Sequence, residues 1–132
     1  KLARELREQP VYKKQLFGGS KIRIDFPGKL DYIPCRITYY FDSSSLCLMR
    51  VTDKLNDIIT PSGMVDTEFK SKPSIFLSKV KEVKFAYLYL DLKKKEYYWT
   101  DEWSQDYLPV AIKFIITSLN QEYVSTVFLP KS

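Results

Sequence analysis

The chain has no histidine among its 132 residues. Histidine is the usual general base near neutral pH, the commonest metal ligand, and the group that activates most serine and cysteine nucleophiles. Cysteine is also scarce, with two residues, and two cysteines without histidine make a poor metal site. These absences remove most histidine-dependent catalysis and metal binding, and we expect no catalytic residue, no metal ligand and no cofactor.

Sequence signals of several other protein classes are missing as well. No stretch approaches the roughly 20 apolar residues that span a bilayer, and no signal-peptide pattern is visible. Gly18-Gly19 lacks the surroundings of a phosphate-binding loop, so we interpret it as a turn. Lysine and arginine exceed the acids by 21 to 16, but they are spread along the chain. The densest run, Lys93 to Lys95, is interpreted as a solvated hairpin tip, and we expect no nucleic-acid partner.

The residues that are present are typical of a single folded domain rich in β-structure. Apolar residues make up 45% and aromatic residues 15% of the chain, which is long enough to bury its own core. Strand-like patterns occur at 20–26, 35–41, 46–51, 75–92, 96–100, 110–119 and 122–130. Together they predict the α+β class, with a helical piece before a mostly antiparallel arrangement of eight or nine strands in one or two sheets.

The connections between these strands are predicted from turn-forming residues and from loss of periodicity. Pro27, Gly28 and Pro34 bracket one loop, and residues 52–73 are interpreted as an irregular connection. Segment 75–92 is predicted to be one long strand with Val83, Phe85, Tyr87 and Tyr89 on one apolar face.

The first ten residues predict the last turns of an amphipathic helix. Leu2 and Leu6 are four residues apart with Ala3 beside them, charged residues surround this stripe, and Pro10 ends the pattern. Because ten residues alone form a marginal helix in water, this helix is either docked on the domain or the end of a longer one.

The two cysteines lie in a predicted hairpin whose turn is "DSSS". The simplest register pairs Phe41 with Leu46 and Tyr40 with Cys47, which leaves Cys35 five residues beyond the partner of Cys47. That offset corresponds to about 16 Å and to opposite faces of the strand, whereas a disulfide needs Cα atoms about 4.4 to 6.8 Å apart. The sequence therefore predicts two free and mostly buried thiols.

Residues 99–109, "WTDEWSQDYLP", hold both tryptophans and three acids. This segment has three possible interpretations: an acid and a base around a sugar ring, a sugar-stacking platform, or a structural loop. The structural interpretation is favoured: Trp99 ends a strand, 101–106 is a solvated crossing, and Leu108-Pro109 precedes the next strand. Trp103 stays the candidate for surface binding.

The order of these segments resembles a known family. The helical piece is followed by "FGGSKIRIDF", "RITYYF", "LCLMRV", "LSKVKEVKFAYLYL", "YYWTDEW", "LPVAIKFIIT" and "STVFLP". This order is similar to that of the J-type minor pseudopilins of bacterial type II secretion and related type IV pilin-like proteins. The resemblance spans most of the chain, from about Phe17 to Pro130.

The resemblance implies a pilin-like fold in which residues 1–10 are the C-terminal end of the pilin-type helix and residues 11–132 form a globular periplasmic domain. It implies a single-pass inner-membrane protein whose anchoring helix precedes this sequence. Such a protein acts without catalysis at the pseudopilus tip, in assembly and in export of folded proteins. Its partners are other minor pseudopilins, with secreted exoproteins as further candidates.

The same resemblance gives the helix stripe a role. Leu2, Ala3 and Leu6 would pack on the globular domain, on the helix of a sister subunit, or on both in turn. Two alternative functions stay open: a minor pilin of a type IV pilus or competence system, and a small glycan-binding β module.

Overall fold

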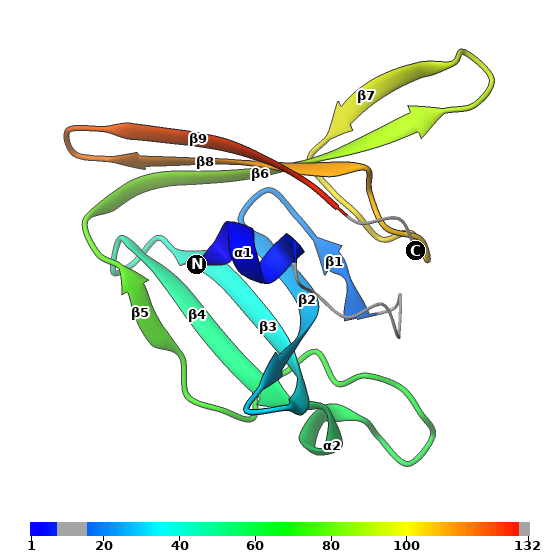
Figure 1. The fold of residues 1–132 in the computed structure, drawn as a ribbon. Helices are drawn as coiled ribbons and strands as arrows, with labels where there is room; N and C mark the ends of the chain where they lie inside the picture. Colours follow the sequence, from blue (N-terminus) through cyan, green and yellow to red (C-terminus); the bar gives the residue numbers. More distant parts are fainter. Residues whose placement is uncertain (8–15, 130–132) are drawn as a thin grey trace.

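A computed structural model describes residues 1–7 and 16–129 of the chain (Figure 1). The first helix was predicted to end at Pro10 and the last strand at Pro130, and both positions lie outside these residues. Within them, the chain forms nine strands in two antiparallel sheets and two short helices. The α+β class and the predicted number of strands are therefore confirmed.

The first sheet contains five strands in the order β1-β2-β3-β4-β5. Their bounds are β1 (Gly18–Gly19), β2 (Arg23–Leu30), β3 (Ile33–Asp42), β4 (Cys47–Lys54) and β5 (Ser74–Leu77). The helix α1 (Leu2–Arg7) precedes this sheet, and α2 (Leu55–Ile58) follows β4.

The second sheet contains four strands in the order β7-β6-β8-β9. Their bounds are β6 (Val80–Asp91), β7 (Glu96–Thr100), β8 (Ala111–Ser118) and β9 (Glu122–Phe128). Figure 1 shows this sheet lying across one end of the first sheet, with α1 between the two and the β6–β7 hairpin extending away from the body. The tip of that hairpin holds Lys93 to Lys95, as predicted, because β6 pairs with β7 up to Asp91 and Glu96.

The predicted single strand 75–92 is wrong, because the chain breaks between β5 and β6 and changes sheet there. Lys79, in the break, has a φ of 56°, which is outside the strand region. The N–H of Val80 then donates to the carbonyl of Leu46 at the tip of the β3–β4 hairpin. Apolar alternation continues through both strands, so periodicity alone did not reveal the break.

The predicted loop around Pro27, Gly28 and Pro34 is also wrong, because these residues lie within β2 and β3. The turn is instead the two residues Asp31 and Tyr32, both with positive φ, at 50° and 66°. Both prolines lie within the β2–β3 pairing, and they are tolerated because the strands on the other sides, β1 and β4, stop short of them. β1 pairs with β2 only at Asp25 and Ile24, and β4 pairs with β3 from Cys35 onward.

Gly18-Gly19 is a short strand rather than a turn, which corrects another prediction. A Cβ atom on Gly19 would stand 1.8 Å from the hydroxyl oxygen of Tyr87, so only glycine permits this approach. The Tyr87 hydroxyl donates to the carbonyls of Ser20 and Arg23 at 2.9 and 3.2 Å, directly beside β1. The glycine pair therefore marks where the two sheets meet.

The hairpin with the cysteines is shifted by two residues from the predicted register. Asp42 pairs with Cys47, because the Asp42 carboxylate accepts bonds from Ser44 and Ser45 and closes the turn after residue 42. Cys35 lies seven residues along β3 from Asp42, the partner of Cys47. The offset is still odd and still long, so the two thiols lie on opposite faces and far apart, as predicted. Both thiols are free and buried, as predicted.

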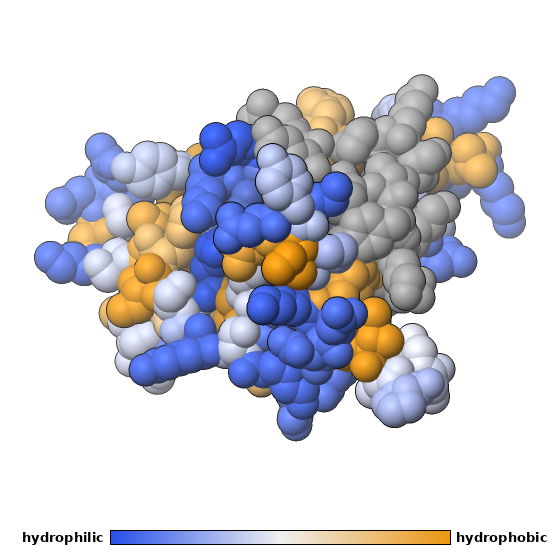
Figure 2. All heavy atoms as spheres, turned by 60° about the horizontal axis from the view of Figure 1, so that its bottom comes forward, coloured by the Kyte–Doolittle hydropathy of each residue, from blue (hydrophilic) through white to orange (hydrophobic). Residues whose placement is uncertain are grey.

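Residues 52–73 are more ordered than predicted, since β4 continues to Lys54 and α2 follows. Residues 66–71, here called the strap, cross the outer face of the first sheet. Arg36 donates to the carbonyls of Asp66 and Glu68 in the strap, and Asp53 accepts from the N–H groups of Lys70 and Ser71. Arg36 and Asp53 also pair with each other at 3.2 Å and are buried. Figure 2 shows one face of the molecule, on which hydrophilic and hydrophobic side chains are interspersed.

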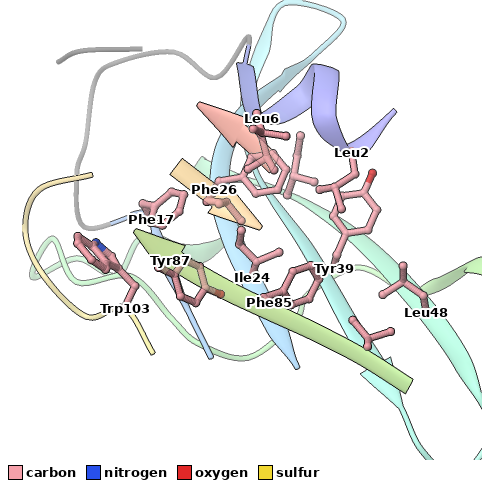
Figure 3. Packing of buried hydrophobic residues seen from close by; sticks show 14 of the residues in the cluster. Leu2, Leu6, Phe17, Ile24, Phe26, Tyr39, Leu48, Phe85, Tyr87 and Trp103 are labelled. Atoms are coloured by element: carbon pink, nitrogen blue, oxygen red, sulfur yellow. The ribbon is translucent and has the colours of Figure 1, made fainter. Parts of the chain in front are cut away.

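The core lies between the inner faces of the two sheets (Figure 3). β2 and β3 contribute Ile24, Phe26 and Tyr39, and β6 contributes Phe85 and Tyr87, all of them fully buried. The residues predicted for the apolar face of β6 do point inward, because Val83, Phe85 and Tyr87 are buried and Tyr89 packs partly against them. The two sheets therefore share one core.

Candidate partner-binding site

The helix stripe predicted for partner binding is packed on the protein's own domain. Leu2 is 4% exposed and Leu6 0%, and both belong to the core cluster, with Ala3 partly buried against it. In Figure 3 the two leucines point from α1 toward Phe26 and Tyr39. Because residues four apart share one face of a helix, α1 buries this whole stripe in the opening between the sheets.

A polar cluster of Glu5, Tyr39 and Arg50, here called the latch, fixes α1 to the first sheet. The Arg50 Nη2 atom lies 2.6 Å from Oε2 of Glu5, and its Nε donates to the Tyr39 hydroxyl at 3.1 Å. The Tyr39 hydroxyl in turn donates to Oε1 of Glu5. Burial, and then the bond to Glu5, raise the pKa of Tyr39 well above its ordinary range, so this hydroxyl stays protonated and donating.

Sequence reasoning missed the latch. Glu5 is one of the charged residues around the helix stripe, and Arg50 lies within "LCLMRV" with no local sign of a partner. Tyr39 and Arg50 are direct cross-strand partners, whereas the predicted register is two residues out of step and pairs Tyr39 with Leu48. Both registers place Tyr39 and Arg50 on one face, so the missing information is that α1 brings the Glu5 carboxylate to this face.

Burial of the stripe leaves the opposite side of α1 for contact with other molecules. Lys1 and Arg4 are exposed there. The surface that α1 offers to a partner is therefore cationic, and the apolar stripe itself is occupied.

Trp103, the residue predicted as a candidate for surface binding, is 4% exposed. Its backbone pairs with Gly19 in an isolated bridge, and its indole N–H donates to the carbonyl of Tyr107 at 2.8 Å. The ring lies 6.4 Å from that of Tyr87 at the edge of the core. That indole is therefore part of the junction between the sheets, and the surface-binding prediction for Trp103 is corrected.

The remaining residues of segment 99–109 follow the predicted structural loop. Trp99 lies in the last positions of β7, Asp101, Glu102 and Asp106 are exposed, and β8 begins after Pro109. Trp99 is 41% exposed and pairs with Leu88, whose side of the sheet is opposite to that of Tyr87. The two indoles therefore lie on opposite sides and form no common stacking platform.

No protein-family model and no curated protein sequence matches the chain. The fold and the site geometry, together with the order of sequence segments, therefore carry the functional argument.

Residues 1–7 and 16–129 contain no group of three or more Cys, Asp or Glu side chains placed to hold a metal ion. None of the helices in this part of the chain has the length and apolar character needed to cross a membrane.

Proposed function

We propose that the chain is the globular periplasmic part of a J-type minor pseudopilin. In this proposal it is a non-enzymatic subunit at the tip of the type II secretion pseudopilus, acting in pseudopilus assembly and in the export of folded proteins. Its partners are the other minor pseudopilins, and an inner-membrane helix preceding residue 1 anchors it. A minor pilin of a type IV pilus or competence system is the alternative with the same architecture.

The observation that carries the proposal is the attachment of α1 to the domain that follows it. A subunit of a helical fibre needs a helix that leaves its globular domain in a fixed direction, because the helix packs in the fibre while the domain faces outward. Leu2 and Leu6 in the core and Glu5 in the latch supply three attachment points within one and a half turns of helix. The antiparallel domain and the segment order from about Phe17 onward support the same proposal.

The glycan-binding alternative is not carried forward. It required two indoles near each other on the surface, and Trp103 is in the core.

The test is co-purification of the full-length protein with each of the other minor pseudopilins produced in the same bacterium. We expect a complex with at least one of them. Charge reversal at Arg4, on the exposed side of α1, should weaken that complex because the free side of the helix faces the partner. Lys21→Glu is the matched control, since Lys21 is also an exposed cation but lies in the turn after β1.

Leu6→Asp is not a suitable variant for this test. Leu6 is fully buried, so a carboxylate there would destabilise the whole domain rather than an interface alone. Absence of any complex with minor pseudopilins, or a cleavable secretory signal upstream in place of about 20 apolar residues, would contradict the proposal.

A further inference from the structure

The second sheet carries apolar side chains on both faces, and several of those on its outer face are exposed. Strand pairing places Trp99, Leu88, Ala111 and Phe128 in one row across β7, β6, β8 and β9. Leu88 and its row partners alternate with the buried residues Tyr87, Ile112 and Val127, so the row lies on the outer face. Ala111, in the middle of this row, is fully buried, whereas Trp99 and Phe128 at its ends are exposed.

The row continues into a wider exposed patch. Trp99 is 41% and Phe128 67% exposed. On one side Tyr97 pairs with Leu90, and on the other Ile115 pairs with Val124. Together these side chains form the outer patch, which comprises Leu88, Leu90, Tyr97, Trp99, Ile115, Val124 and Phe128. Exposed aromatic and aliphatic side chains gathered across a sheet mark an interaction surface.

Inside the outer patch the charges have one sign, whereas Glu82 and Glu122 lie on the same face one row beyond it. The outward side chains of β6 from Lys84 to Leu90, and those paired with them on β7, β8 and β9, include no carboxylate. They include two cations, Lys84 and Lys113. Lys84 is already paired with Glu82 at 3.2 Å. The ammonium of Lys113 lies over the ring of Trp99, 4.5 Å from its centre, and is directed into the patch.

These charges argue against a second copy of the chain as the occupant. Two outer patches brought face to face would place Lys113 of each copy in the same contact, and each chain carries a net charge of +5. A partner with carboxylates beside an apolar stripe would instead pair with Lys113 while covering Trp99 and Phe128.

We infer that the outer patch binds an amphipathic helix of another protein that carries acidic residues along its apolar stripe. Four strands span about 14 Å from β7 to β9, which one helix of about 10 to 12 Å diameter covers. A helix on a sheet face is also the usual way to bury the second apolar face of a sheet. The inference concerns the side of the sheet opposite to α1 and does not depend on the proposed function.

The probes are two synthetic helical peptides of equal length with the same leucine stripe, one flanked by glutamates and the other by lysines. Amide chemical shifts of the isotope-labelled protein are followed during titration. We expect the glutamate peptide to shift residues of β6 to β9 and the lysine peptide to bind up to about fivefold more weakly, the largest factor given by one exposed charge pair. Lys113→Glu should reverse this preference.

Phe128→Ser should weaken binding of the glutamate peptide, and Ile75→Ser is its matched control. The exposed fraction of Ile75, 63%, is similar to the 67% of Phe128, but Ile75 lies on β5 of the other sheet. Circular dichroism of both variants checks that the fold is retained. The inference is overturned if the glutamate peptide does not bind at millimolar concentration, if both peptides bind equally, or if the protein dimerises through Phe128.

Discussion

Arg50→Met tests the latch, because it removes the cation that joins Glu5 of α1 to Tyr39 of β3. Methionine keeps most of the aliphatic length of arginine, so the packing of the side-chain stem is largely preserved. Glu5 then retains one donor, the Tyr39 hydroxyl, and loses its charge partner in a largely buried place. The free energy of unfolding should fall.

The size of the effect follows from burial. Loss of one partner from a fully buried ion pair costs about 3 to 5 kcal/mol, whereas an exposed pair contributes about 0.2 to 1 kcal/mol. The side chains of Arg50 and Glu5 are 18% and 15% exposed. The pair is mostly but not fully buried, and the Tyr39 hydroxyl still donates to Glu5. We therefore expect the free energy of unfolding to fall by about 2 to 3 kcal/mol.

The assay is urea unfolding of four proteins at pH 7: wild type, Arg50→Met, Glu5→Gln and the double variant. The coupling energy from this cycle should be about 1 to 2 kcal/mol, and it should persist in high salt because water is largely excluded. Lys21→Met is the control, since the Lys21–Asp101 pair is 57% and 63% exposed with 4.0 Å between its atoms. A coupling below about 0.5 kcal/mol would refute a structural role for the latch.

Two further predictions concern single buried positions. Burial raises the pKa of Cys35 from 9.0 to about 11. As pH rises, this thiol therefore ionises in the unfolded chain before it ionises in the folded protein. Stability should therefore fall by up to about 2 to 3 kcal/mol between pH 9 and 11, and less in Cys35→Ala, as measured by urea unfolding across that range. Gly19→Ala should cost about 1 to 3 kcal/mol in thermal unfolding because its Cβ would overlap Tyr87. Gly18→Ala, whose Cβ would lie 3.6 Å from the nearest atom, should cost little; equal losses would contradict this contact.

Periodicity predicted the parts of the fold that obey one period over a long stretch. Alternation located β6 through Tyr87 because Val83, Phe85 and Tyr87 are buried on one face, and it located β8 because Ile112 and Ile116 are buried on one face. The spacing of Leu2 and Leu6 likewise predicted the buried side of α1. In each case the buried positions repeat at the period of the backbone, so the spacing of apolar residues in the sequence predicts the element.

Features set by contacts between distant segments could not be predicted in the same way. The role of Gly19 depends on Tyr87, and the strap is held by Arg36 and Asp53 from neighbouring strands. Each of these residues looks ordinary in its local sequence. Trp103 was misplaced for the same reason, since its burial comes from the bridge to Gly19 rather than from the solvated residues around it.

The latch joins α1 to the middle of the first sheet rather than to its edge. Tyr39 and Arg50 are paired across β3 and β4, and both strands have neighbours on their other sides. A force along α1 would reach Glu5 and pass to two strands that are held by the backbone hydrogen bonds of the β2–β3, β3–β4 and β4–β5 pairings. Detaching the helix would therefore require breaking the ion pair and exposing Leu2 and Leu6 together. In the proposed pseudopilin, this attachment would make the domain follow its own helix during fibre assembly.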